Sequence, residues 1–446
     1  MIDLRRRSFG LKAILAREYS KKFDATASSS LSAAMDALEG YAFGQSPEKV
    51  HQRVAGDSSE IYLDMADPDN RVIRISGGKW EIAYESPYKF RRTELTAPLP
   101  EPKRGGEIDR LWKHVNVFPE DRGVLIGVAI DALIRPNTAK PILIFHGEHG
   151  SAKTATAKRF RSLVDPSSAD MHLPPRDVGQ LLVKAAGGWL MAFDNVSSLS
   201  SDVSDILCAL ATGAGVTDRT LYTNFDLSVL KFRRSIMLTT IHLDRLRGDF
   251  ADRVVSIKQP VIDGRTITRE TEEDLDSQWP EDWPVILGAL LDQAANVQQK
   301  LRTLGRQKNP PRMADFAKIL VAYDELFGTE SLERYREQLM SGLVASIDGD
   351  VFTQHLIACR YSTDDSGRAS KDILEDIEKR FPELQLTKPK GWPPSPRTVT
   401  GILRRQAPSL RQMGWKIEDD EGKNKGNSVR FVIRPPKAAD GGESTS

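Results

Sequence analysis

The pattern of apolar and polar positions divides the chain into stretches with different periods. In residues 5–55, apolar positions recur three and four apart around LKAILAREY and LSAAMDALEGYAF, which is typical of amphipathic helices. IYLDM, RVIRIS and KWEIAYE then alternate between apolar and polar residues, and the turn-forming runs DPDN and SGGK separate them. We therefore expect a helical N-terminal region over residues 1–57 and a small β unit over residues 58–95.

A run rich in proline and glycine, TAPLPEPKRGG, covers residues 96–106 and predicts a linker between domains. After it come two helical patterns, IDRLWKHV and DRGVLIGVAIDALI, and then strands and helices alternate to about residue 330. Such alternation predicts an α/β domain with a mostly parallel sheet and helices on its faces. We assign residues 107–335 to it.

The C-terminal part has a different order of elements. VFTQHLIACR, SKDILEDIEKRF and SPRTVTGILRRQAPSLRQM read as three helices, with Ser370 and Ser395 as N-caps and Pro396 in a first turn. WKIEDD and SVRFVIRP are expected to pair as a hairpin across EGKNKGN. Three helices followed by a hairpin is the order of a winged helix, so we expect that fold over 345–436 and a disordered tail over 437–446.

Composition narrows the class of protein only a little. The 63 lysines and arginines nearly balance the 62 aspartates and glutamates, so any surface for nucleic acid must be local. Two cysteines, Cys208 and Cys359, are too few for a disulfide framework. The apolar run at 123–134 is too short to span a membrane, and Lys12 and Arg17 interrupt the first apolar stretch, which argues against a signal peptide. We expect a cytoplasmic protein of several domains.

The stretch GEHGSAKT at residues 147–154 is the strongest candidate for a site. It lies between the apolar run PILIFH and the helical run ATAKRFRSLV, as a phosphate-binding loop would, with a lysine for the phosphates and a hydroxyl for Mg²⁺. The candidate residues for ATP are Gly147, Gly150, Ser151, Ala152, Lys153 and Thr154. Ala152 stands where the pattern has glycine, and a positive φ there would cost about 1–2 kcal/mol. An ordinary glycine-rich turn is the alternative.

A second stretch, GGWLMAFDN, predicts a buried strand that ends in Asp194. We expect it to be the neighbour of the first strand, so that Asp194 and Thr154 together hold Mg²⁺. Asn195 follows, where many ATPases carry a glutamate. An amide can position the attacking water but cannot take its proton, so slow hydrolysis is an open alternative.

Three further segments offer groups for phosphate. RRSIMLTTI predicts a strand that ends in Thr239 and Thr240, whose hydroxyls could contact the γ-phosphate or the attacking water. Arg253, in DFADR, could reach the ATP of a neighbouring subunit, or it could be an ordinary surface or ion-paired arginine. Arg312, in PRMADFA, could touch phosphate within its own subunit, or form an ion pair at the start of a helix.

Candidate contacts to DNA lie in two places. RTLYTNFDLSVLKF, residues 219–232, reads as two short strands with Phe225 near the tip and Lys231 at the base. Phe225 could stack on a base, although an aromatic residue in a loop more often packs against protein. In the expected winged helix, cations gather on the third helix and in the hairpin loop: Arg397, Arg404, Arg405, Arg411, Lys423 and Lys425. A solvated helix face on a protein-binding winged helix is the alternative.

These motifs resemble a known family. GEHGSAKT, LVDPSSADMHLPPRD, FDNVSSLSSDVSDILCALATG, RTLYTN, DFADR and PRMADFA look like ATP-binding proteins of the DNA primase/helicase type from phages and integrated elements. Those proteins are similar to superfamily-three helicases of the AAA+ class. The resemblance covers about residues 30–330, and the order of segments beyond 350 fits it. The first hundred residues contain no acidic constellation typical of a primase.

The resemblance implies roles for single residues. Lys153 and Thr154 would bind phosphate and magnesium, and Asp194 would be the Walker B acid. Thr239 would be sensor 1, where the family tends to have asparagine. Arg253 would be the arginine finger and Arg312 a sensor 2 residue, while the 219–232 insertion would line the pore of a ring.

We therefore expect an AAA+ ATPase of the helicase type that acts on DNA as a ring of six subunits. Single-stranded DNA would occupy the pore, and duplex DNA would bind to the winged helix. A separate primase or another protein encoded by the element would be a partner. Two alternatives stay open: an ATP-gated DNA-binding initiator or loader with slow hydrolysis, and an inert scaffold that keeps the fold for assembly.

Overall fold

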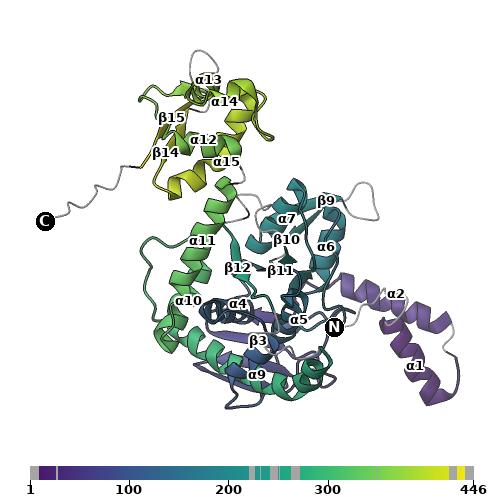
Figure 1. Ribbon diagram of the computed structural model, residues 1–446. Helices are drawn as coiled ribbons and strands as arrows, with labels where there is room; N and C mark the ends of the chain where they lie inside the picture. The colour runs from purple at the N-terminus through teal and green to yellow at the C-terminus, as the bar shows by residue number, and fades with distance from the viewer. Residues whose placement is uncertain are drawn as a thin grey trace.

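The chain forms an N-terminal helical arm, a central body and a smaller C-terminal unit (Figure 1). The computed structural model describes residues 10–26, 29–219, 227–231, 233–241, 250, 252–262, 272–348, 350–420 and 429–436. The last helix of the body, α11 (Ser331–Asp348), leads directly into the C-terminal unit.

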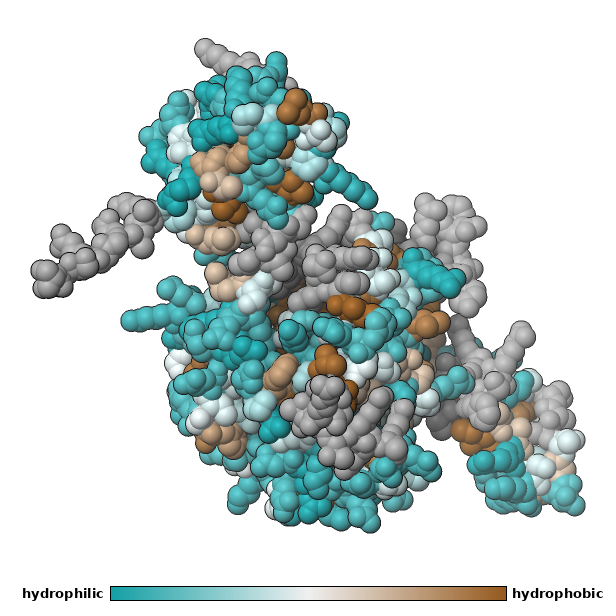
Figure 2. All heavy atoms as spheres, in the orientation of Figure 1, coloured by the Kyte–Doolittle hydropathy of each residue, from teal (hydrophilic) through white to brown (hydrophobic). Residues whose placement is uncertain are grey.

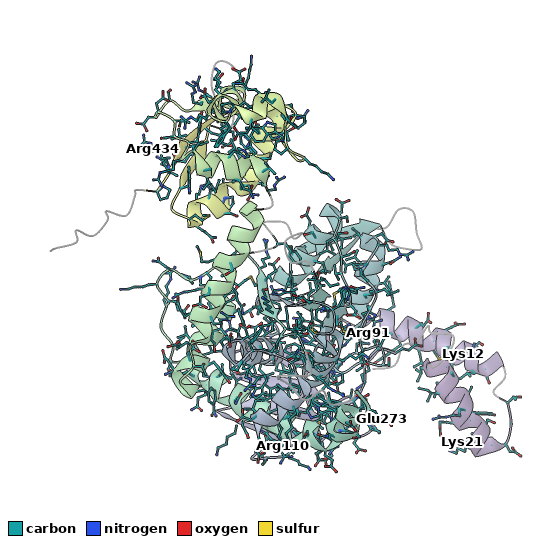
Figure 3. The ribbon with its side chains drawn as sticks, viewed as in Figure 1. Lys12, Lys21, Arg91, Arg110, Glu273 and Arg434 are labelled. Carbon is teal, nitrogen blue, oxygen red and sulfur yellow. The ribbon has the colours of Figure 1, made fainter. Side chains whose placement is uncertain are left out.

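The arm consists of two helices, α1 (Leu11–Phe23) and α2 (Ser29–Phe43), which project from the body. Lys12 Nζ donates a hydrogen bond to Ser32 Oγ at 3.0 Å and so joins the two helices. Lys12 and Lys21 both lie on this arm (Figure 3), and hydrophobic side chains are visible on its surface (Figure 2). The predicted helical region is thus present, but it ends at Phe43.

Residues that were expected to be helical up to position 57 instead begin the β unit. β1 (Val50–His51) pairs in parallel with β6 (Lys89–Phe90). β2 (Val54–Gly56), β3 (Glu60–Asp64), β4 (Val72–Ser76) and β5 (Lys79–Ala83) form an antiparallel sheet in that order. All three residues of β2 are buried, so this strand has no polar alternation from which a sequence reading could detect it.

The segment 96–106, predicted to be a linker, is packed against the body. Leu99 is only 4% exposed, and Lys103 N donates to Pro284 O at 2.9 Å. A Cβ added at Gly288 would lie 1.7 Å from Lys103 O, so the segment crosses α9 (Glu272–Leu301) in backbone contact. The β unit also shares one hydrophobic core with the helices of the body. The predicted boundary between separate domains is therefore wrong.

The centre of the body is a parallel sheet, as the alternating pattern predicted. Its strands are β7 (Ile142–His146), β8 (Leu190–Phe193), β11 (Ser235–Thr240) and β12 (Val254–Lys258), in the order β12-β7-β11-β8. They are buried along most of their length, which explains their continuous apolar runs. β8 does not neighbour β7 as we expected, because β11 lies between them. Local periodicity does not encode the order of strands.

Helices cover both faces of this sheet. The face that includes Leu143 and Phe145 packs with α4 (Arg122–Ile134), α5 (Lys153–Val164), α9 and α10 (Ala314–Phe327). The opposite face, which includes Ile142 and Ile144, packs with α6 (Val178–Gly187) and α7 (Ser201–Thr212). Short helical turns precede α4: η1 (Ile108–Arg110), α3 (Leu111–His114) and η2 (Pro119–Asp121).

An antiparallel hairpin lies between β8 and β11 in the chain. Its strands are β9 (Gly215–Arg219) and β10 (Leu227–Lys231). β10 lies within the stretch 219–232 where two short strands were expected, but β9 precedes that stretch and shares only Arg219 with it. Phe225, expected near the tip, lies outside the described residues.

The C-terminal unit has its own hydrophobic core. Its elements are α12 (Val351–Ala358), β13 (Arg368–Ala369), α13 (Ser370–Arg380), α14 (Glu383–Leu386), α15 (Pro396–Gln412), β14 (Lys416–Asp419) and β15 (Arg430–Arg434). The three strands form one antiparallel sheet in the order β13-β15-β14. Arg434 lies on the outside of this unit (Figure 3).

Two capping predictions have different outcomes. Ser395 caps α15, where its Oγ accepts a hydrogen bond from Thr398 N at 3.3 Å, and this prediction is confirmed. Ser370 is not a cap: Ala369 occupies the N-cap position of α13, and Ser370 Oγ lies 2.7 Å from Thr400 Oγ1. The predicted tail, 437–446, lies outside the described residues. No helix in the described part of the chain is long and apolar enough to cross a membrane.

Candidate functional site

The loop between β7 and α5 is a tight turn with several residues at positive φ. Gly147 and Gly150 have φ values of 155° and 80°, and a Cβ at Gly147 would lie 3.0 Å from Gln259 O. Ala152 precedes α5 with φ 58° and ψ 31°, in the left-handed region. Because a methyl group is unfavourable there, the alanine costs about 1–2 kcal/mol relative to glycine. The departure from the usual pattern therefore falls on a position that needs a positive φ.

Asn116 holds the loop from the side. Its Nδ2 donates to Ser151 O at 2.9 Å and to Pro260 O at 2.8 Å, and its backbone N donates to Thr156 Oγ1 at 3.1 Å. The sequence reading missed this residue. A single asparagine ahead of a helix carries no signal that it will reach a loop 35 positions further along the chain.

The side chain of Lys153 lies across the loop. Its Nζ donates to Gly147 O at 2.9 Å and to Glu148 O at 2.7 Å. Burial lowers the pKa of Lys153, and the nearby carboxylate of Asp194 opposes that shift. The loop therefore concentrates one ammonium group and the first N–H groups of α5 at the carboxyl end of β7, an arrangement that favours an anion.

Thr154 and Asp194 meet at the carboxyl edge of the sheet. Thr154 Oγ1 lies 2.9 Å from Asp194 Oδ1 and 3.2 Å from Oδ2, which brings together the two residues that we expected to hold Mg²⁺. Hydroxyl and carboxylate oxygens are hard ligands, and Mg²⁺ needs only one or two carboxylates beside phosphate and water. Within the described ranges no group of three His, Cys, Asp or Glu residues could hold a metal. The pair fits Mg²⁺ bound together with phosphates.

Thr239 organises the residues at the end of β8. Its Oγ1 donates to Asp194 Oδ1 at 2.6 Å and accepts from Asn195 N at 2.8 Å. Asn195 itself has φ 53°, a left-handed conformation that asparagine tolerates better than most residues. Thr240 Oγ1 donates to Val196 O at 2.7 Å. Both threonine hydroxyls thus bond to the segment after β8.

The two candidate arginines lie at the other edge of the sheet. Arg253 O accepts from Ile142 N at 2.8 Å, which places Arg253 beside the first residue of β7. Arg312 Nη1 lies 3.3 Å from Asp252 Oδ2, at the same amino edge. The five residues of β7 separate this edge from the loop, on the order of 13 Å at about 3.3 Å per residue. The expected contact of Arg312 with phosphate in its own subunit does not fit this placement.

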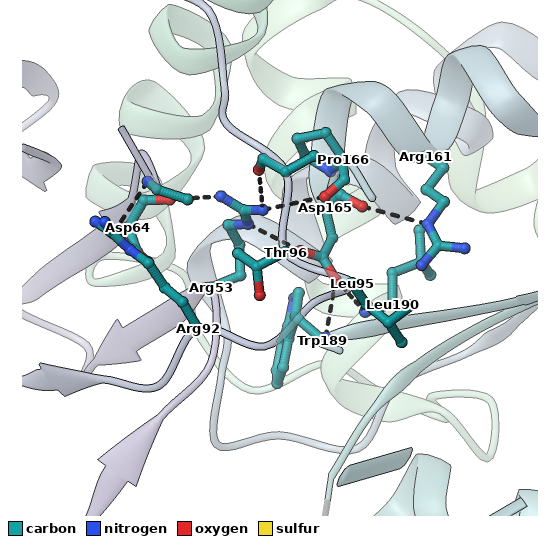
Figure 4. A network of polar contacts seen from close by, with 12 residues as sticks. Arg53, Asp64, Arg92, Leu95, Thr96, Arg161, Asp165, Pro166, Trp189 and Leu190 are labelled. Carbon is teal, nitrogen blue, oxygen red and sulfur yellow. Dashed lines mark hydrogen bonds and ion pairs between the residues drawn. The ribbon is translucent and has the colours of Figure 1, made fainter. Parts of the chain in front are cut away.

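A buried network fixes the far end of α5 (Figure 4). Asp165, which follows the helix, accepts from Arg53 Nε at 2.8 Å through Oδ1. Its Oδ2 accepts from the backbone N–H groups of Trp189 and Leu190 at 2.8 and 2.9 Å. One carboxylate therefore joins the β unit, the end of α5 and the start of β8, and it sets the relative position of the elements that carry Thr154 and Asp194.

Cations line the exposed face of α15, with different surroundings. Arg397 is exposed in the first turn and has no hydrogen bond or ion pair to any residue that the structure describes. Arg404 Nε lies 2.6 Å from Asp419 Oδ2, and Arg405 Nη2 lies 3.0 Å from Asp350 Oδ2. Arg404 and Arg405, two of the four candidate DNA contacts on this helix, are thus ion-paired within the unit.

The other predicted DNA contacts are less well defined. Arg411 Nη2 and Nε donate to Ile417 O, so this arginine joins the end of α15 to β14. Lys231 is the last residue of β10, but the structure does not describe its side chain. Lys423 and Lys425 lie outside the described residues.

Two family matches cover most of the chain. Residues 108–343 match the actinomycete integrative conjugative element replication protein family, and residues 353–442 match the AICE RepA C-terminal domain. The chain belongs to this replication protein family. That membership confirms the mobile-element part of the resemblance. The second match begins close to α12, where the C-terminal unit starts.

No curated protein matches this replication protein. Three solved structures are similar to it at 12% identity. SCCmec type IV Cch, described as an active helicase, is 12% identical, with a TM-score of 0.43 over 94% of this chain and 86% of that one. The NrS-1 C-terminal region is 12% identical, with a TM-score of 0.35 over 84% of this chain and 96% of that one. The JCV helicase is 12% identical, with a TM-score of 0.25 over 50% and 66%.

Proposed function

We propose that this replication protein is an ATP-dependent DNA translocase of the helicase type, with an AAA+ core. The observation that carries the proposal is the convergence of Lys153, Thr154 and Asp194 at the carboxyl edge of the parallel sheet, with Thr154 Oγ1 2.9 Å from Asp194 Oδ1. This is where a triphosphate and its magnesium bind in nucleotide-hydrolysing proteins of this topology. Replication, the role of the family, supplies DNA as the substrate.

In this proposal each residue has a separate task. Backbone N–H groups of the loop and the Lys153 ammonium bind the β- and γ-phosphate oxygens, and Thr154 and Asp194 would hold Mg²⁺. The ion, when bound, supplies positive charge against the phosphates. Asn195 orients the attacking water. Thr239 holds Asp194 and Asn195 in their relative positions through its two hydrogen bonds.

Arg253 acts between subunits in this scheme. It lies at the amino edge of the sheet, too far from the loop of its own chain to reach a phosphate there. An arginine in that position can stabilise transition-state charge only on the nucleotide of a neighbour, which requires an oligomer. A closed ring, most simply a hexamer, gives every loop such a neighbour.

DNA is proposed to meet the protein at two places. The β9–β10 hairpin would line the pore, where Phe225 and Lys231 contact a single strand. The C-terminal unit, with three main helices followed by a hairpin, would act as a winged helix on duplex DNA through Arg397, Arg404 and Arg405, together with Lys423 and Lys425 in its loop. The exposure of the arginine face of α15 supports the second contact.

The test is ATP hydrolysis by the purified protein with and without single-stranded DNA, together with its mass in the presence of ATP and Mg²⁺. We expect hydrolysis that DNA stimulates, that Lys153→Ala abolishes, and that accompanies a ring-sized assembly. Absence of ATP binding would contradict the proposal and favour an inert scaffold.

Two features of the loop and of β8 favour a second function, in which ATP is bound but hydrolysed slowly. Ala152 strains the loop at φ 58°, and Asn195 offers no carboxylate as a base. Both would slow turnover without preventing ATP binding. The alternative is therefore an ATP-gated initiator or loader, for which tight ATP binding, negligible hydrolysis and nucleotide-dependent DNA affinity are expected.

A further inference from the structure

A cavity of about 590 Å³ lies at the amino edge of the central sheet, away from the loop. The turn between β2 and β3, the residues that follow α4, the end of α9 and Lys318 of α10 form its walls. Its volume is in the range of cavities that hold small molecules, about 300–1,000 Å³. The length of β7 separates it from Lys153, so the two places cannot share one ligand.

The charges around this cavity favour an anion. Arg135, Arg302 and Lys318 line it, against a single carboxylate, that of Asp57. Arg135 is paired with Asp315 at 2.8 Å. Lys318, in contrast, has no hydrogen bond or ion pair to any part of the chain that the structure describes. The positive charge of Lys318 is therefore not paired with a carboxylate of the described residues.

The carboxylate of Asp57 is turned to its own loop. Its Oδ1 accepts from Ser59 N at 2.7 Å and from Ser59 Oγ at 2.6 Å. Arg302 Nη2 donates to Ser59 O at 2.5 Å, which fixes this guanidinium at the edge of the cavity. The other N–H groups of the guanidinium stay available. A planar cation with free donors is suited to phosphate oxygens.

Apolar side chains form part of the wall. Leu301 of α9, which is partly exposed, and Ile134 of α4, which is 2% exposed, both line the cavity. Gln298 also belongs to the wall, and its Nε2 donates to Ser59 O at 3.4 Å. Its Oε1 is enclosed by protein atoms, so a ligand in the cavity would not contact that oxygen.

We propose that this cavity binds a nucleoside phosphate. A nucleobase is flat and apolar on its faces, which matches the apolar part of the wall at Leu301 and Ile134. The phosphate would lie against Arg302 and Lys318. The site is separate from the ATP site of the proposed function and does not depend on it. The same chemistry occurs in a free nucleotide and in the phosphorylated end of a DNA strand.

Equilibrium dialysis of the full chain with labelled ATP tests this site. We expect the wild type to bind two nucleotides per chain and Lys153→Ala to bind one. The triple variant Lys153→Ala, Arg302→Glu, Lys318→Glu should bind none. Arg306→Glu is the matched control, because this exposed arginine follows α9 but does not line the cavity, and it should leave the Lys153→Ala value unchanged.

The counts separate failure of this site from failure of the loop. If the cavity binds nothing, the wild type binds one nucleotide and Lys153→Ala none, and the proposal is overturned. If only the loop fails, the wild type and Lys153→Ala each bind one nucleotide, and Arg302→Glu with Lys318→Glu removes it. Circular dichroism melting of every variant shows that a loss of binding is not a loss of folding.

Competition in the Lys153→Ala background identifies the source of the ligand. If the ligand is a strand end, a 5′-phosphorylated oligodeoxynucleotide should displace ATP at least tenfold better than the same strand with a 5′-hydroxyl. If the ligand is a free nucleotide, ATP and ADP should displace it and neither strand should. Displacement by inorganic pyrophosphate as strong as that by ATP would overturn the proposal, because the apolar wall would then contribute nothing.

Discussion

Thr239 Oγ1 lies 2.6 Å from Asp194 Oδ1 and accepts a hydrogen bond from the backbone N–H of Asn195. One hydroxyl thus bonds both to the carboxylate proposed to hold Mg²⁺ and to the backbone of Asn195, whose side chain is proposed to orient water. Thr239 is 1% exposed, so water cannot easily replace these bonds if the hydroxyl is removed. In the structure Thr239 acts on Asp194 and Asn195, and through them on the phosphate site.

The first prediction concerns this hydroxyl. Thr239→Val keeps the shape of the side chain but removes both hydrogen bonds, and we expect kcat for ATP hydrolysis to fall about 10- to 100-fold. Thr239→Ser retains the hydroxyl and should keep most of the activity. The Mg²⁺ concentration for half-maximal rate should rise in the valine variant alone. Equal activity of the two variants would contradict this role.

The second prediction concerns the strained turn. Ala152→Gly should stabilise the protein. The substitution removes the cost of an alanine at φ 58°, about 1–2 kcal/mol. It also adds conformational entropy to the unfolded chain, but this costs less, about 0.4–1 kcal/mol. Ala155→Gly, within the first turns of α5, is the control and should destabilise by about 0.5–1 kcal/mol. Urea unfolding of both variants measures the difference, and a loss of stability in Ala152→Gly would show that the turn is not strained.

The third prediction concerns the buried network. Asp165→Ala leaves the Arg53 guanidinium, whose side chain is 0% exposed, without its charge partner. Loss of one member of a buried pair typically costs about 3–5 kcal/mol. Asp276→Ala is the matched control, since Asp276 pairs with Arg159 but is 61% exposed, and we expect a change of at most about 1 kcal/mol. Similar unfolding free energies for the two variants would argue against the network.

The fourth prediction concerns pH. Burial lowers the pKa of His146 from 6.5 to about 4, and that of His172 likewise to about 4. The unfolded chain therefore binds more protons than the folded protein between pH 6.5 and about 4, and stability should decline as pH falls through this window. His146→Gln should reduce the slope of unfolding free energy against pH. An unchanged slope in this variant would contradict the prediction.

The fifth prediction concerns duplex DNA. Arg397→Ala should weaken binding and lower the slope of log affinity against log salt by about 0.9, the value for one phosphate contact. Arg404→Ala should have a smaller effect, because that guanidinium already pairs with Asp419 at 2.6 Å. A filter-binding salt titration compares them. If neither variant changes the salt slope, α15 does not face DNA.

The sequence by itself determined the features that depend on neighbours along the chain. The order β7, loop, α5 followed from an apolar run, small residues and a helical pattern in immediate succession, and the Ser395 cap followed from its position before Pro396. The parallel sheet followed from the alternation of elements. Each of these rests on short-range stereochemistry or on the burial of whole strands, and both leave a trace in local composition.

Only the tertiary structure decided how distant segments meet. It inserted β11 between β7 and β8, packed the segment 96–106 on α9 through Gly288, and brought Asn116 to Ser151. It also carried Arg312 to the edge of the sheet opposite Lys153. The physical reason is that such contacts are selected by the shape and burial of the complete core, whereas the local pattern of a segment reports only that one of its faces must be covered.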